Sequence, residues 1–197
     1  MFTESEYFDE QFKDIQFSKE EVVAVHFYDC TFTNCEFSET VFDECKFTGC
    51  TFIHCDLNLM KVANSKFSQV YFMQSKLVGV NWTEAEWPRI TVPSLLKFEE
   101  CTLNHSTFIG VALPQSTIMN CSVKDVDFRE ADLTKANLRG SDFTESVFGE
   151  TNLSGADLSH ASNYQIDPSQ NRIRQAKFML PEALNLLYCM DIVIDED

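Results

Sequence analysis

The stretch FYDCTFTNCEFSETVFDECKFTGCTFIHCDL, residues 27–57, carries a large apolar side chain at every fifth position. The same spacing runs from Phe12 to Val92 and, after one extra residue in the count, from Phe98 to Leu158. All 30 positions on this count are large and apolar, in a chain that is 44% hydrophobic overall. The spacing therefore reflects a repeat of five residues rather than composition.

The residue two places before most of these centres is small or slim. Between residues 30 and 55 this place is mainly cysteine, and after residue 130 it is mainly alanine or serine. A period of five fits neither the 3.6-residue turn of a helix nor the two-residue repeat of a flat strand. It fits a short extended segment followed by a corner, with two of each five side chains facing inward. Because such a unit cannot bury its apolar side alone, the repeats must stack on one another.

Three units make a family resemblance visible: Ala131-Asp132-Leu133, Ala136-Asn137-Leu138 and Ala156-Asp157-Leu158. They resemble the A(D/N)LXX pattern of the pentapeptide-repeat proteins, in which four repeats form one coil of a right-handed quadrilateral β-helix. The resemblance covers about residues 12–178 and implies an all-β fold. At the strand spacing of ~4.8 Å, the expected rod is roughly 36 Å long.

Five segments are expected along the chain. They are an N-terminal cap or tail at 1–11, a first sub-array at 12–92, a register-shifting break at 93–97, a second sub-array at 98–178, and a C-terminal end at 179–197. Both tryptophans and two prolines lie around the break. Because proline cannot donate to a strand ladder, a bulge or loop is predicted there.

The C-terminal end departs from the five-residue pattern. Residues 163–171 are predicted to form a loop, with Asp167-Pro168 as a turn signal. Leu180-Pro181-Glu182-Ala183 begins like a short helix, and residues 191–195 are predicted to form a terminal strand. A helix this short is unstable alone in water. We expect it to cap the rod, to pair with a second copy, or to do both.

The charge of the chain excludes several kinds of partner. Asp and Glu total 31 against 15 for Lys and Arg, which gives a net charge of -16. Such an excess disfavours direct binding to nucleic acid or to an anionic membrane. No apolar run approaches the length of a membrane span, and the first six residues are acidic where a secretion signal is basic and then apolar. We therefore expect a cytoplasmic protein that contacts neither membrane nor nucleic acid directly.

Residue types that often mark an active site lack a matching arrangement. Seven of the eight cysteines fall at the small inward position and no C-x-x-C pair occurs, so we expect buried, reduced thiols. His26, His54, His105 and His160 fall on outward positions, and no phosphate loop or nucleophile motif accompanies them. The sequence predicts no enzyme, no metal site and no cofactor.

Carboxylates gather on particular faces when residues are assigned by their place in a 20-residue coil. In each half of the array two adjoining faces are acid-rich, whereas the face through Phe27, Phe47 and Phe67 is balanced by basic residues. Such a stripe suits a basic, DNA-binding groove, and a solvated surface that keeps the rod soluble is the simpler alternative. The predicted partner-binding stripe comprises Glu36, Glu39, Asp43, Glu44, Asp56, Asp125, Asp127, Glu130, Asp142, Glu145 and Glu150.

Within the family, the chain is most similar to the Qnr-type branch, with its albicidin- and microcin-immunity relatives. The resemblance rests on the rod length, on the central break entered through residues 77–83, on the run NYQIDP at 163–168 and on the terminal helix followed by DIVI. It implies a homodimer joined through the C-terminal helix, roughly 70–80 Å long by coil spacing. It also implies that this acidic rod imitates DNA, binds DNA gyrase or topoisomerase IV, and protects the enzyme from inhibitors such as quinolones. The expected dimer contacts are Leu180, Leu184, Leu187, Ile192 and Ile194.

A scaffold or interaction protein whose partner is unrelated to DNA enzymes is the alternative function. The outward apolar residues Ile53, Tyr71 and Met73 would suit such a contact. Binding through them would be nearly independent of ionic strength, whereas binding through the carboxylates would weaken with salt. The sequence leaves open which inhibitor is countered and how the acid-rich faces align across the break.

Overall fold

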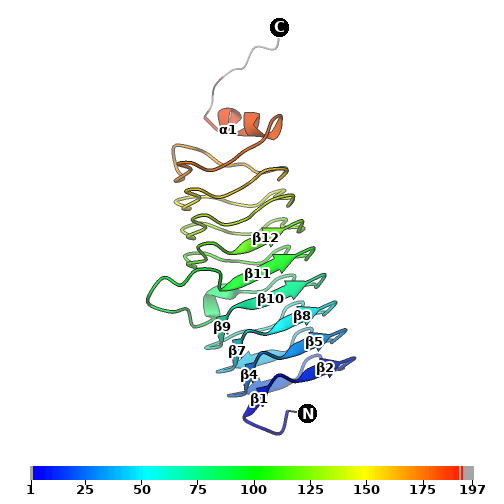
Figure 1. Cartoon of the computed structure of the whole chain (residues 1–197). Coiled ribbons are helices and arrows are strands. Elements are labelled where there is room, and N and C mark those ends of the chain that lie inside the picture. The colour runs from blue at the N-terminus through cyan, green and yellow to red at the C-terminus, as the bar shows by residue number, and fades with distance from the viewer. Residues whose placement is uncertain (1, 191, 193–197) are drawn as a thin grey trace.

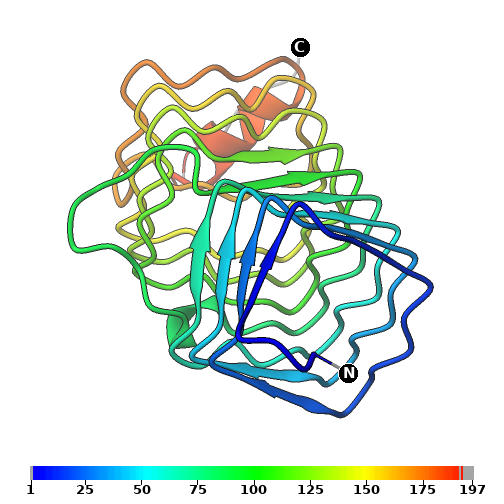
Figure 2. The same ribbon diagram turned by 60° about the horizontal axis from the view of Figure 1, so that its bottom comes forward.

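The computed structural model of the chain describes residues 2–190 and residue 192. The chain winds as a parallel β-solenoid whose coils stack into one rod, with a short helix at the C-terminal end (Figure 1). Seen nearer to the rod axis, the coils are four-sided (Figure 2). The predicted all-β quadrilateral β-helix is confirmed.

Four ladders of paired segments form the four faces, which we number in chain order from Phe12. Face 1 is the longest sheet and contains β2 (Gln11–Lys13), β5 (Thr31–Thr33), β8 (Thr51–Ile53), β10 (Val70–Met73), β11 (Leu96–Glu99) and β12 (Thr117–Met119), continued by single bridges at Asn137, Asp157 and Lys177. Face 4 contains β1 (Glu6–Phe8), β4 (His26–Tyr28), β7 (Lys46–Thr48) and β9 (Lys66–Ser68), and its later coils pair at Ala112, Asp132, Asn152 and Arg172.

The other two faces consist mainly of single bridges. Face 3 contains β3 (Glu21–Val23) and β6 (Val41–Asp43), followed by bridges at Lys61, Asn81, Thr107, Asp127 and Val147. Face 2 pairs through Gln16, Glu36, Asp56, Lys76, Thr102, Ser122, Asp142 and Ser162. The described residues also form three short helical segments: η1 (Trp82–Glu84), η2 (Glu182–Leu184) and α1 (Asn185–Tyr188).

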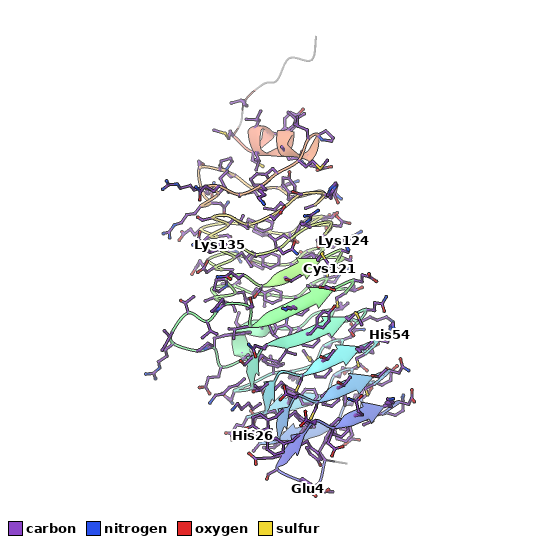
Figure 3. All side chains as sticks on the ribbon, in the orientation of Figure 1. Glu4, His26, His54, Cys121, Lys124 and Lys135 are labelled. Carbon is purple, nitrogen blue, oxygen red and sulfur yellow. The ribbon has the colours of Figure 1, made fainter. Side chains whose placement is uncertain are left out.

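The five-residue unit explains the core. Of the 30 predicted centres, 26 are buried, and rings on successive coils stack, as Phe32 and Phe52 do with centroids 4.6 Å apart. Two residues after most centres the backbone turns a corner at positive φ, for example 52° at Asn34 and 57° at Glu39. A single residue can adopt this left-handed conformation at modest cost, which lets four extended segments close one coil. Polar side chains point outward along the whole rod (Figure 3).

The central break places six extra residues in one coil. Phe98 lies beside Phe72, 26 positions earlier, whereas Phe72 lies beside Phe52, 20 positions earlier. Regular pairing continues to Glu86, whose amide donates to the Ser65 carbonyl at 2.8 Å. Residues 87–94 then leave the coil as a projecting loop (Figure 1). The count of fives placed Val92 in the core, and this was wrong: Phe98 takes the place beside Phe72, and Val92 is 38% exposed in the loop.

Aromatic and leucine side chains close the two ends of the core. Coil pairing begins before Phe12, because β1 pairs with β4. The Phe2 ring lies across this end, with centroids 5.2 Å from Phe27 and 5.9 Å from Tyr7. At the other end η2 and α1 form the predicted helix, and Leu186 packs against the core. The predicted terminal strand falls on residues 191–195, of which only Ile192 lies among the described residues.

Residues 163–171, predicted as a loop, contribute to the core. They include no strand, but Tyr164 and Ile166 are fully buried. The Tyr164 ring lies 5.6 Å from the ring of Phe178. The unit centre is displaced by one residue here, from the asparagine expected by count to the following tyrosine. The pattern of five therefore missed an aromatic core residue.

Candidate partner-binding surface

Acidic side chains are concentrated on two adjoining faces of the rod. With five residues assigned to each unit and the irregular residues 163–171 left out, faces 2 and 3 carry 14 acidic and 5 basic residues, a net charge of −9. Faces 1 and 4, together with the loop, carry 10 of each. The acidic surface, as we call the first group, consists of Glu36, Glu39, Asp56, Asp125, Asp142 and Glu145 on face 2 and Glu20, Glu21, Asp43, Glu44, Glu84, Asp127, Glu130 and Glu150 on face 3.

All eleven residues of the predicted stripe lie on the acidic surface. The structure adds an alignment that the sequence left open, because Lys76 pairs with Thr102 and Asn81 with Thr107 across the break. The acid-rich faces of the first half therefore continue directly into the acid-rich faces of the second half. The loop leaves the rod between faces 4 and 1, at the corner diagonally opposite the one shared by faces 2 and 3.

The predicted stripe left out Glu21 and Glu84, and the sequence analysis missed Glu20 altogether. It occupies the place two residues before Val22, which the repeat normally gives to a small buried side chain. In the structure Glu20 is exposed, and its unit belongs to the first coil, where β3 pairs only with β6 and no earlier coil lies beside it. Its neighbour Glu21, on the same face, was a signal that could have identified it.

The most accessible carboxylates stand at corners. Glu39, Asp125 and Glu145 lie where face 2 turns into face 3, and all three are exposed at positive φ. Glu130 and Glu150 repeat this arrangement where face 3 ends. Half-buried carboxylates, among them Asp56 and Asp142, line the middle of the faces. The surface therefore presents rows of charge that run parallel to the rod axis.

Few of these carboxylates are neutralised locally. Lys19 Nζ lies 3.4 Å from Glu39, Lys124 Nζ 3.1 Å from Asp142, and Arg129 pairs with Asp127. His105 Nδ1 lies 2.9 Å from Asp125. Within the described chain, the ten other members form no ion pair: Glu20, Glu21, Glu36, Asp43, Glu44, Asp56, Glu84, Glu130, Glu145 and Glu150. Exposed pairs are weak, so the surface keeps a negative field.

Hydrogen bonds hold the central carboxylates in their charged form. Partial burial of Asp142 opposes ionisation, but bonds from Thr144, Asn163 and Lys124 outweigh it and lower the pKa of Asp142 to about 2. The Asn163 amide donates to Asp142 Oδ1 at 2.7 Å, and the Thr144 hydroxyl donates to the same oxygen at 2.6 Å. Asp127 is similar, since Arg129 lowers its pKa against the effect of burial. Both groups are charged at neutral pH.

A second candidate surface lies at the C-terminal end of the rod. Leu180 is 71% exposed, and Leu187 and Ile192 are also exposed, whereas Leu184 is half-buried. Ile194, the fifth predicted dimer contact, lies outside the described residues. The predicted contacts miss three neighbouring exposed apolar side chains: Met179, Tyr188 and Met190.

The cysteines and histidines do not form a site in the described part of the chain. All eight cysteines are free, and seven are buried, including Cys121 (Figure 3). Burial raises the pKa of Cys50 to about 12, and its thiol donates to the Phe27 carbonyl. His54, which points away from the rod in Figure 3, is exposed, as are His105 and His160. No metal-binding cluster and no helix able to cross a membrane is found among residues 2–190 and 192.

Comparisons with known proteins agree with this fold. The family model described as a pentapeptide repeat region matches residues 25–96 and 94–158. A trypsin-treated variant of QnrB1, a plasmid-mediated fluoroquinolone resistance protein, is 16% identical, with a TM-score of 0.66 and coverage of 94% of this chain and 100% of that chain. Full-length QnrB1 is 18% identical, with a TM-score of 0.61 and coverage of 95% and 100%.

HetL, a pentapeptide repeat protein involved in heterocyst differentiation regulation in the cyanobacterium Nostoc, is 14% identical. Its TM-score is 0.62, and the match covers 88% of this chain and 87% of HetL. No curated protein matches the chain. At these identities the likeness to solved structures concerns the fold alone. The family-model matches cover more than half of the chain, which therefore belongs to the pentapeptide-repeat family.

Proposed function

We propose that this protein imitates DNA, binds the basic DNA-binding groove of a type II topoisomerase (DNA gyrase or topoisomerase IV), and protects the enzyme from inhibitors such as quinolones. The observation that carries the proposal is the segregation of charge. A rod that used acid only for solubility would have no reason to place a net charge of −9 on two adjoining faces and none on the other two.

The dimensions of the acidic surface suit a groove that accepts a duplex. The ladder of face 1 runs from Gln11 to Lys177 in eight coil steps, or roughly 38 Å, close to the ~34–36 Å of one DNA turn. A duplex carries one charge per ~1.7 Å of axis over its whole circumference. The acidic surface carries one net charge per ~4 Å on one side of the rod. A groove faces only one side of its ligand, so the two charge densities are comparable.

The similarity to QnrB1 supports the proposed inhibitor class, because that protein is described as a fluoroquinolone resistance protein. The exposed apolar end supports a homodimer, since burying Leu180, Leu187 and Ile192 against a second copy removes apolar surface from water. Two rods joined end to end would present roughly 70–80 Å of acidic surface. In this mechanism the protein acts in the cytoplasm by occupying the DNA-binding groove of the topoisomerase. It requires no catalytic group, cofactor, membrane or direct contact with nucleic acid.

A gyrase supercoiling assay with and without a quinolone tests this function. The full chain should restore supercoiling in the presence of the drug at micromolar concentration. Inhibition of gyrase without rescue would contradict protection while leaving DNA mimicry in place. If the protein changes supercoiling neither with the quinolone nor without it, binding to the topoisomerase is contradicted as well.

A scaffold with a partner unrelated to DNA enzymes is the second candidate. The match to HetL, a regulator rather than a resistance protein by its description, favours this class. On face 1, Ile53 and Met73 lie side by side on neighbouring coils, and the Tyr71 hydroxyl donates to a Glu99 carboxylate oxygen. A partner held by this half-buried patch should bind equally well at low and high salt. Binding through the acidic surface should instead weaken as salt rises.

A further inference from the structure

An apolar hollow of about 280 Å³, open to solvent, lies between the projecting loop and face 4. Phe67 and Leu95, both nearly fully buried, contribute to its floor, and Trp87, Pro88 and Val92 of the loop contribute to its wall. The Trp87 indole is fixed, because its Nε1 donates to the Trp82 carbonyl at 2.9 Å. The hollow is therefore already formed in the free protein, and it lies outside faces 2 and 3.

An uncompensated cation stands at the rim of this hollow. Lys46 and Lys66 are direct partners in the pairing of β7 with β9, and like charges in that arrangement destabilise each other. Lys66 is neutralised by Glu86, with Nζ 3.2 Å from the carboxylate. Lys46 forms no ion pair within the described chain, and its Nζ lies 5.0 Å from the centroid of the Tyr28 ring. The Lys46 ammonium also donates to the Tyr28 hydroxyl at 3.5 Å, and because neither contact supplies a negative charge, Lys46 can still attract an anion.

The same charged residues also border a second, polar hollow. Lys46, Lys66 and Glu86 line a space of about 560 Å³ together with His26, Glu44 and Asn64. These three charged side chains therefore lie between the apolar hollow and the polar hollow. Such a boundary suits a ligand that has an apolar body at one end and an anionic group at the other.

We propose that the apolar hollow binds a small aromatic carboxylate. The flat body of the ligand packs on Trp87 and Phe67, and its carboxylate meets Lys46. A volume of about 280 Å³ is at the small end for ligand sites, which favours a bicyclic ring over a larger molecule. Glu86, held by Lys66, would repel a second negative charge and so favours monoanions. This site uses no residue of the acidic surface and is independent of the proposed topoisomerase function.

The two indole N–H signals of the ¹⁵N-labelled full chain provide the test. 2-Naphthoate serves as the anionic probe and 2-naphthylmethanol as its neutral counterpart. A Trp87→Phe variant assigns the signals. Titration with 2-naphthoate should shift the Trp87 signal and leave that of Trp82, which is fully buried, in place. Affinity should be weak, about millimolar, as expected for a ligand of this size.

Matched lysine variants separate the anion contact from general charge effects. Lys46→Met should weaken naphthoate binding about fivefold and leave the neutral probe unchanged. Lys61→Met, at the same place of its unit on face 3, should change neither. Val92→Glu, which places a carboxylate in the wall, should abolish naphthoate binding. No shift of the Trp87 signal, equal binding of both probes, or equal effects of the two lysine variants would overturn the proposal.

Discussion

Lys76 and Thr102 lie side by side on successive coils although they are 26 residues apart in the sequence. On the same face, Asp56 pairs with Lys76 at the regular separation of 20. The six additional residues thus all lie in the loop, and each face continues in alignment from the coil before the break to the coil after it. This pairing joins two acid-rich halves into one continuous surface.

Removal of the six residues 89–94 should leave the rod intact. The deletion restores the regular separation of 20 between Phe72 and Phe98, and a shorter loop lowers the entropic cost of closure. We expect an unchanged circular dichroism spectrum and a Tm within a few degrees of that of the parent chain, as measured by thermal unfolding. Deletion of five residues instead should destabilise the protein strongly, because it shifts every later side chain out of register. Equal stabilities of the two variants would contradict the pairing.

Acid should destabilise the rod in part through Asp142. Its pKa is lowered from 3.8 to about 2, so its contribution to stability is complete above about pH 4 and is lost as the pH falls toward 2. Asp142→Asn should therefore reduce the free energy of unfolding at pH 6 and have a much smaller effect near pH 2. Denaturant unfolding at both values measures the difference. Asp56→Asn, at the same place of its unit on face 2 and without an ion pair among residues 2–190, serves as the control.

Thiol accessibility tests the packing of the coils. Seven cysteines are buried in the core, and burial raises the pKa of Cys45 to about 11. Only Cys189 is partly exposed. A chromogenic disulfide reagent should titrate one thiol per native chain and eight in guanidinium, and Cys189→Ser should remove the native reaction. Rapid reaction of several thiols in the native protein would show that the coils open.

The apolar C-terminal end should control association. A carboxylate at Leu187 cannot be buried against a second copy without a large desolvation cost. Leu187→Asp should therefore convert a dimer into a monomer in sedimentation equilibrium. Val23→Asp, at an apolar residue that is 51% exposed near the other end, should leave the dimer unchanged. A parent chain that sediments as a monomer would contradict the dimer.

Where every unit has the same length, position in the sequence determines position in space. The centres from Val22 to Trp82 and the placement of the acid-rich faces could therefore be predicted from spacing alone. Spacing also predicts that the cysteines are inward, because a slim side chain fits beside a large ring. Glu20 departs from the pattern in the first coil, where no earlier coil lies beside its unit.

Prediction failed where the unit length changes. Val92 fits the count of fives, but the count cannot distinguish a regular coil from one that contains a loop of six additional residues. Tyr164 was missed for the same reason, since its unit is displaced by one residue. The hollow beside Trp87 depends on how the loop folds back on face 4, and no local pattern encodes that contact.

Competition with DNA for purified gyrase tests most directly the claim that the acidic surface occupies a DNA-binding groove. Two triple variants to lysine carry the same charge change: one at Glu130, Glu145 and Glu150 on the acidic surface, the other at Asp14, Asp29 and Glu100 on faces 1 and 4. All six residues are exposed at corners of positive φ. The parent chain and the second variant should displace DNA from gyrase with similar affinity, whereas the first variant should be weakened about tenfold or more. Equal affinity of the two variants, or no displacement of DNA by the parent chain, would contradict the account.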